Sequence, residues 1–126
     1  MDVTPVVPSD RQVIESYGRA SFRVSGVVHE GAILVFPDKT VPLAAREMSE
    51  VNEGSLAPVL ARGRDVEILL LGCGARMMLV PKSLRTRLKE AGIVVDAMDT
   101  GAACRTYNVL MAEDRRVAAA LLPAGA

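Results

Sequence analysis

The sequence contains no tryptophan and only two tyrosines and two phenylalanines among its 126 residues. Four aromatic rings are too few for the stacking platform on which single-stranded nucleic acid binds. The 15 basic side chains are balanced by 15 acidic ones, so the formal net charge is +0. A protein that grips phosphate backbones carries an excess of positive charge. The composition therefore excludes nucleic acid as an expected partner.

Histidine and cysteine are also scarce, since His29, Cys73 and Cys104 are the only residues of these two types. One imidazole and two separated thiols do not have the ligand spacing of a zinc site. Two cysteines are too few for a disulfide framework, which indicates a reducing compartment. The chain has no Gly-x-Ser-x-Gly elbow and no phosphate-binding P-loop. We expect no metal and no other cofactor, and we favour a protein that is not an enzyme.

Long apolar runs are missing as well. The longest uninterrupted one, Ile68–Ala75, is far shorter than the roughly 20 residues that span a bilayer. The first eight residues have neither a basic start nor an apolar core, so we expect no export signal. These features predict a cytoplasmic protein that would reach the inner membrane only through its partners.

The length fits one domain. Residues 1–12 contain Pro5 and Pro8 and show no periodicity, which predicts a mobile N-terminal arm. Residues 13–123 are then expected to form a single globular domain. From Val13 to Phe36 apolar residues recur with period two between glycines, which predicts an antiparallel meander. A turn at 37–39 and a brief edge strand at 40–43 follow.

The second half alternates between strands and helices. Ser55 is expected to cap a short helix at 55–61. Thr100 is expected to cap a longer helix from about Ala102 to Asp114, and a helix that begins at Pro81 ends at Gly92. Two apolar runs, 66–71 and 93–97, predict buried strands. A third run, 117–122, is expected to form the final strand, and its alanines also allow the alternative that it extends the preceding helix. A β-rich half followed by a β-α-β-α-β unit predicts an α/β fold with a small, mainly parallel sheet.

Two segments are expected to meet where the parallel strands end, and we call them the strand-end rim. They are 72–76, directly after one strand, and 99–108, directly after the next. Ligands of parallel α/β sheets gather at this edge, and free N–H groups at a helix start can hold an anion. The candidate ligand-binding residues are Gly72, Gly74, Arg76, Asp99, Thr100, Gly101, Cys104, Arg105 and Asn108. Arg76 and Arg105 would supply the counter-charge.

The same residues have a second interpretation. The glycines and Thr100 can serve only as turn and cap residues, since short motifs often match by chance. Cys104 near a helix start and beside Arg105 has features of a reactive thiolate. A nucleophilic cysteine normally needs a base, however, and His29 lies in the other half of the chain. The alternative is an ordinary buried cysteine.

Candidate protein-contact residues lie on and near the predicted helices. Lys82, Arg85 and Lys89 recur on one helix face, which is either a solvated face or a dock for an acidic partner. Tyr107 would anchor a partner if it is exposed. An open edge strand would also allow a homodimer through strand pairing.

The run from Met98 to Leu110 reads Met-Asp-Thr-Gly-Ala-Ala-Cys-Arg-Thr-Tyr-Asn-Val-Leu. Shorter characteristic runs occur in order along the chain: 16–18, 22–26, 31–37, 69–74 and 116–121. In these runs the chain resembles a widespread family of small domains that includes the mitochondrial respiratory complex I assembly factor three. The resemblance covers residues from about 13 to 122.

This resemblance implies an α/β fold with a hammerhead-like N-terminal half, and it supplies no catalytic residues. It implies a role in assembling a membrane respiratory complex through protein contacts, with complex subunits or membrane-insertion components as partners. The alternative function is binding of a small molecule or anion at the strand-end rim, with or without thiol chemistry.

Overall fold

The computed structural model describes residues 10–125. Most of the predicted N-terminal arm, residues 1–9, lies outside the described residues. The next residues contact the rest of the domain. Arg11 forms an ion pair of 3.0 Å with Asp114, and the N–H of Gln12 donates to the carbonyl of Pro37.

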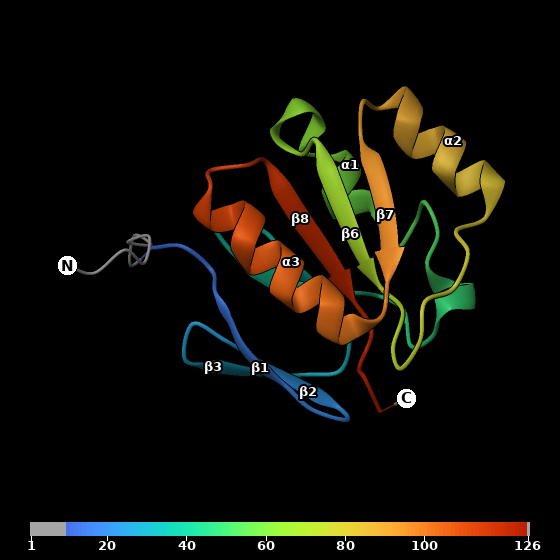
Figure 1. Ribbon diagram of the computed structural model, residues 1–126. Coiled ribbons are helices and arrows are strands. Elements are labelled where there is room, and N and C mark those ends of the chain that lie inside the picture. The colour runs from blue at the N-terminus through green and yellow to red at the C-terminus, as the bar shows by residue number, and fades with distance from the viewer. Residues whose placement is uncertain (1–9, 126) are drawn as a thin grey trace.

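The N-terminal half begins with a three-stranded antiparallel sheet (Figure 1). Its strands are β1 (Ile14–Tyr17), β2 (Ser21–Val24) and β3 (Val27–Glu30). Ser25 and Gly26 both have positive φ, which is the geometry of the tight hairpin turn that suits twisted strands. The predicted meander is confirmed for these three strands, and glycine supplies the backbone freedom at its second turn. The last run assigned to the meander, residues 33–36, lies instead in the second sheet.

A second sheet has five strands in the order β5-β4-β8-β6-β7. Its strands are β4 (Ile33–Val35), β5 (Thr40–Pro42), β6 (Ile68–Gly72), β7 (Val94–Met98) and β8 (Val117–Leu121). Strands β8, β6 and β7 are parallel, whereas β4 pairs antiparallel with both β5 and β8. The predicted α/β class is confirmed. The sheet is mixed, because the antiparallel hairpin of β4 and β5 is added beside β8 to the three parallel strands.

Three helices connect and cover the strands: α1 (Ala57–Leu60), α2 (Lys82–Glu90) and α3 (Thr100–Ala112), beside short 3₁₀ turns at Met48–Glu50 and Gly63–Asp65. Both predicted caps are wrong. Leu56 occupies the N-cap of α1, while the Ser55 hydroxyl accepts from the N–H of Asn52. The carboxylate of Asp99 caps α3 by accepting from the N–H of Ala102 at 2.9 Å.

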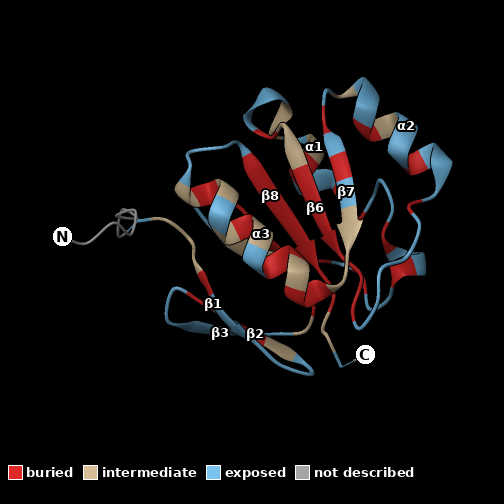
Figure 2. Cartoon of the chain, viewed as in Figure 1, coloured by how far each residue is buried: buried red, intermediate tan, exposed pale blue. Residues whose placement is uncertain are grey.

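The five-stranded sheet is covered on both faces, which produces two cores. Helix α3 and the three-stranded sheet pack on one face around Phe22, Tyr107 and Leu70. Helices α1 and α2 contribute to the other core, around Leu71 and Leu88. Strand β8 is buried along its whole length (Figure 2). Its alanines at 118–120 leave room for the layers on both sides to approach closely.

Strand β7 lies at an edge of this sheet, and the prediction that it is buried is wrong. Its Val95 side chain is buried toward α2, but Val94 is 67% exposed and Asp96 is also exposed. Helix α3 packs chiefly over β6 and β8, so it leaves one face of β7 open. None of the helices between residues 10 and 125 is long and apolar enough to cross a bilayer.

Candidate functional site

The parallel pairing of β6 with β7 places the two segments of the strand-end rim side by side, as the sequence predicts. The peptide groups of Gly74 bind directly to Thr100. The N–H of Gly74 donates to the Thr100 hydroxyl at 2.8 Å, and the N–H of Thr100 donates to the Gly74 carbonyl at 2.9 Å. The polar groups of the two turns therefore satisfy one another.

Thr100 is the centre of this arrangement and is fully buried. Besides accepting from Gly74, its hydroxyl donates to the carbonyl of Leu122 at 2.6 Å. One side chain thus connects the residues that follow β6, β7 and β8. Because both hydrogen-bonding directions of the hydroxyl are used inside the protein, its role in this structure is to hold three strand ends together.

The rim glycines are required by close packing. A Cβ atom on Gly72 would lie 2.9 Å from Cδ2 of Leu121 and 3.1 Å from Cα of Thr100, which is too close for an ordinary contact. A Cβ atom on Gly101 would meet the hydroxyl of Tyr17 from β1. The space beside these two glycines is therefore filled by protein atoms.

The remaining rim candidates are either engaged or exposed. Asn108 pairs with the backbone of Ile14, and Arg76 and Arg105 are exposed at the surface. Hollows of about 420, 340, 400, 390 and 290 Å³ on the described residues are lined by other residues. Ligand binding by the nine candidate residues stays a prediction, and it would require the closed contacts around Thr100 to open.

Cys104 is buried in the core beneath α3, and desolvation raises the pKa of its thiol to about 12. The neighbouring Arg105 acts in the opposite direction but does not offset the burial. Cys73 is also buried, and its sulfur lies 3.6 Å from the Leu71 carbonyl. A neutral, inaccessible thiol is a poor nucleophile, so the geometry favours the buried-cysteine interpretation.

Burial of Cys104 predicts an alkaline loss of stability. The unfolded thiol loses its proton near pH 9, whereas the folded thiol keeps it until about pH 12. Between these two values, each increase in pH favours the unfolded state, because only the unfolded thiol loses its proton. Burial also raises the pKa of Tyr107, so this side chain adds to the loss of stability at high pH. We expect urea unfolding to show about 1–2 kcal/mol less stability at pH 10 than at pH 8. Cys104→Ala should weaken this dependence, and an unchanged slope would contradict the burial of the thiol.

Tyr107 does not serve as a surface anchor, so that prediction is wrong. Its side chain is fully buried in the core beneath α3, and its hydroxyl donates to the carbonyl of Gln12 at 3.0 Å. The ring belongs to the same core cluster as Ile14 of β1 and Ala119 of β8. Lys82, Arg85 and Lys89 are exposed along α2, as the periodicity indicates.

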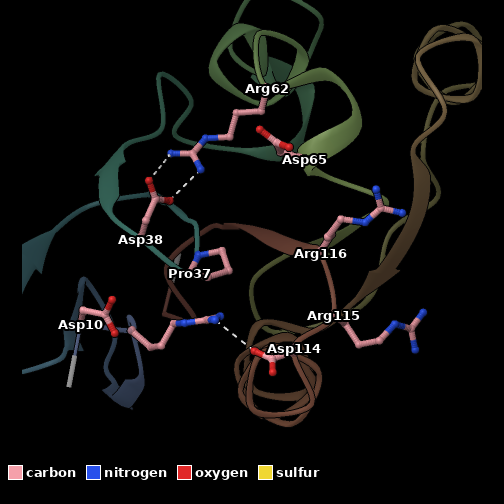
Figure 3. Close-up of a pocket in the computed structure, with 9 residues that line it drawn as sticks. Asp10, Pro37, Asp38, Arg62, Asp65, Asp114, Arg115 and Arg116 are labelled. Atoms are coloured by element: carbon pink, nitrogen blue, oxygen red, sulfur yellow. Dashed lines mark hydrogen bonds and ion pairs between the residues drawn. The ribbon is translucent and has the colours of Figure 1, made fainter. Parts of the chain in front are cut away.

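A hollow of about 420 Å³ at the opposite end of the parallel strands is rich in charge (Figure 3). It is lined by Asp10, Arg11, Pro37, Asp38, Arg62, Asp65, Asp114, Arg115 and Arg116. Sequence patterns do not reveal this cluster, because it joins four segments that are distant along the chain.

The arginines of this hollow are bound by carboxylates. Arg62 donates to both oxygens of Asp38 and also lies 3.8 Å from the centre of the Phe36 ring. The hydrogen bond from Arg62 lowers the pKa of Asp38. Arg115 and Arg116 both pair with Glu67. An incoming anion would have to displace these partners, so we interpret the hollow as a cluster that fastens the N-terminal segment and the 37–39 turn to the sheet.

The most apolar exposed segment is Met77–Leu79, which we call the apolar loop. Leu79 is 84% exposed, and Met77 and Met78 are each about half exposed. The loop joins β6 to α2 and leads directly to the basic residues of that helix. Sequence periodicity does not mark this segment. Its signal is three large apolar residues in succession between the glycines of the β6 end and Pro81, where a turn is expected.

Among the residues the structure describes, no group of three or more histidine, cysteine or carboxylate side chains is placed to hold a metal ion. Exposed apolar side chains also occur on β1, β3 and α3, but the apolar loop, the basic residues of α2 and the open side of β7 combine apolar surface with charge. They lie at neighbouring positions of the β6-α2-β7 unit. Surfaces that combine apolar anchors with a charged rim are typical of protein–protein contacts.

Comparisons with known proteins match almost the whole domain. Residues 14–122 match the model of a family described as proteins of unknown function, DUF498/DUF598. An uncharacterised protein of Rhodobacter capsulatus is 38% identical over 110 residues, which is 87% of this chain and 83% of that protein. The solution structure of a Bordetella pertussis protein described as an Mth938-like domain has 30% identity and a TM-score of 0.84. It covers 99% of this chain and 94% of the other.

A zebrafish (Danio rerio) protein named NADH dehydrogenase [ubiquinone] 1 alpha subcomplex assembly factor 3 is 34% identical over 111 residues. The match covers 88% of this chain and 64% of the zebrafish protein, so the chain spans slightly less than two thirds of that relative. These matches confirm the resemblance found in the sequence runs. The chain belongs to the DUF498/DUF598 family, which includes the complex I assembly factor 3 proteins.

Proposed function

We propose that this protein is a non-catalytic assembly protein that acts through protein–protein contacts in the biogenesis of a membrane respiratory complex. The observation that carries the proposal is the similarity to proteins named as assembly factors of NADH:ubiquinone oxidoreductase, which extends over 88% of this chain. The partners would be subunits of that complex or components that insert them into the membrane.

The surface of the β6-α2-β7 unit supports a contact function. Its apolar loop exposes three large side chains that would be desolvated by a partner. The adjoining α2 exposes Lys82, Arg85 and Lys89, which would form a charged rim around such a contact. Burial of one large apolar side chain in a partner contributes about 1.5–3 kcal/mol, so the loop is expected to dominate the affinity.

Deletion of the gene in the organism that encodes this chain tests the proposal. We expect the amount of assembled NADH:ubiquinone oxidoreductase, measured on native gels of membranes, to fall to a small fraction of the parental level. A plasmid copy of the full chain should restore it. Normal amounts of assembled and active complex in the deletion strain would contradict the proposed function.

A surface variant refines this test. Leu79→Gln should fail to restore the complex while changing the free energy of unfolding by no more than about 0.5 kcal/mol, because the side chain packs against little of its own domain. Val109→Gln is the matched control, since Val109 is an exposed apolar residue on α3, away from the loop. Restoration by both variants would show that the apolar loop is not the contact.

A further inference from the structure

The five-stranded sheet has two edges that differ in their capacity to accept another strand. At one edge, β5 is three residues long and ends in Pro42, which has no N–H to donate. At the other edge, β7 has five residues and contains no proline. Short strands and proline are common means of blocking an edge, and β7 lacks both.

The outer backbone groups of β7 can be identified from the hydrogen bonds on its inner side. The N–H of Val94 donates to the Glu67 carbonyl, and the carbonyl of Met98 accepts from the N–H of Cys73. Alternate residues of a strand face opposite sides, so Val95 and Ala97 direct their N–H and C=O groups away from β6. No strand within residues 10–125 pairs with that side.

On the side toward α2, the side chains along this edge combine apolar surface with positive charge, and the carboxylate of Asp96 lies with Val94 on the opposite face. A hollow of about 290 Å³ beside the strand is lined by Arg85, Lys89, Ile93, Val94 and Val95. Helix α2 lies alongside β7 and supplies the two cations (Figure 1). Neither Arg85 nor Lys89 forms an ion pair with any of the described residues.

We infer that the free edge of β7 binds an extended, acidic segment of a partner protein as an added strand. Main-chain hydrogen bonds to Val95 and Ala97 would supply affinity for an extended segment of any sequence. Arg85 and Lys89 would select acidic side chains on the face toward α2, and the exposed Val94 would contact apolar side chains on the other face. The preferred segment therefore alternates acidic and apolar residues.

A second copy of this chain suits the edge less well than an acidic partner. Two β7 strands paired about a two-fold axis would bring Arg85 and Lys89 of both copies to the shared edge, and like charges at a contact oppose association. The inference deepens the proposed function, on which it rests for its role in assembly, because it names the surface and the chemistry of the partner segment.

Strand addition is measured with the isolated full chain and the probe peptide acetyl-Glu-Val-Glu-Val-Glu-Val-Glu-amide, with the Lys-Val analogue as control. In the free chain the amide hydrogens of Val95 and Ala97 should exchange rapidly. The Glu-Val peptide should slow their exchange by about tenfold or more at saturation, since each would enter a new hydrogen bond. The Lys-Val peptide should leave their exchange unchanged.

Two pairs of variants separate the backbone contribution from the charge contribution. Ala97→Pro removes one outward N–H without touching the bonds to β6, and Ala97→Val keeps the N–H while adding similar bulk. The double variant Arg85→Glu/Lys89→Glu reverses the local charge, and Arg19→Glu/Arg46→Glu makes the same change in net charge at two exposed arginines elsewhere. We expect the first member of each pair to weaken peptide binding by about tenfold and the second to leave it nearly unchanged.

Protection of Val95 and Ala97 that is lost in Ala97→Pro and in the Arg85/Lys89 variant supports the inference. Absence of peptide binding, or protection confined to another strand such as β3, overturns it. A dimer of the chain alone that Ala97→Pro abolishes would overturn the acidic-partner assignment and identify a second copy as the occupant. These measurements do not depend on the respiratory complex, so their failure is distinguishable from failure of the proposed function.

Discussion

Thr100→Val is expected to lower the free energy of unfolding by about 2–4 kcal/mol, although the two side chains have nearly the same shape. The hydroxyl of Thr100 accepts from the N–H of Gly74 and donates to the carbonyl of Leu122, and the residue is fully buried. Valine would leave one donor and one acceptor without a partner in a space that water does not reach. Each such group costs about 1–3 kcal/mol.

Urea unfolding followed by circular dichroism measures this loss, with Thr100→Ser as the matched control. Serine keeps the hydroxyl and removes only a methyl group, so it should cost about 1 kcal/mol. Equal losses for valine and serine would mean that packing, and not the two hydrogen bonds, accounts for the burial of Thr100. In that case the hydrogen bonds of Thr100 would not be what holds the three strand ends together.

Asn108→Leu is expected to cost about 2–3 kcal/mol and to loosen the three-stranded sheet. The side-chain amide of Asn108 accepts from the N–H of Ile14 at 2.9 Å and donates to the Ile14 carbonyl at 2.8 Å. It therefore pairs with β1 as a neighbouring strand would. Leucine has a similar size but no polar atoms, so both backbone groups of Ile14 would lose their partner.

Amide hydrogen exchange distinguishes this effect from general destabilisation. In Asn108→Leu the amides of β1 and β2 should exchange much faster than in the wild type, while those of β6 and β8 keep most of their protection. Asn108→Asp retains the acceptor for the Ile14 N–H and should have a smaller effect. Uniform acceleration in both sheets would show that Asn108 does not hold the smaller sheet separately.

The local patterns of the chain predict most of the fold because local chemistry and tertiary packing agree there. Glycines between runs of period two mark the meander. Gly92 has positive φ and lies just after the C-terminal end of α2, where the sequence predicts that the helix stops. The continuous apolar runs at β6 and β8 correspond to strands buried on both faces. These signals depend on neighbours in sequence, so one sequence suffices to find them.

Features that depend on distant contacts were not predictable. Asp99 and Thr100 are adjacent, and both are suitable cap residues. The hydroxyl of Thr100 is hydrogen-bonded to Gly74 and Leu122, so the carboxylate of Asp99 caps α3. The apolar run at 93–97 does not reveal that α3 stops short of β7. The charged Asp96 between the apolar Val95 and Ala97 was the available sign of a half-exposed strand.

In the candidate site, too, features set by neighbours in sequence were predictable and features set by distant contacts were not. Sequence spacing correctly places the two rim segments next to each other, yet it does not show that Tyr17 and Leu121 occupy the space beside Gly101 and Gly72. The basic periodicity of α2 is visible in the sequence and in the structure. Its relation to the free edge of β7 becomes apparent only from the sheet order.

We propose that this protein works through the exposed surface of its β6-α2-β7 unit and not through chemistry at the strand-end rim. The most direct test returns full-length variants to the deletion strain and measures assembled NADH:ubiquinone oxidoreductase at equal abundance of the variant chains. We predict that Arg85→Glu/Lys89→Glu fails to restore the complex and that Cys104→Ala/Arg105→Ala restores it. Restoration by the first variant together with failure of the second would contradict the claim and assign the function to the rim.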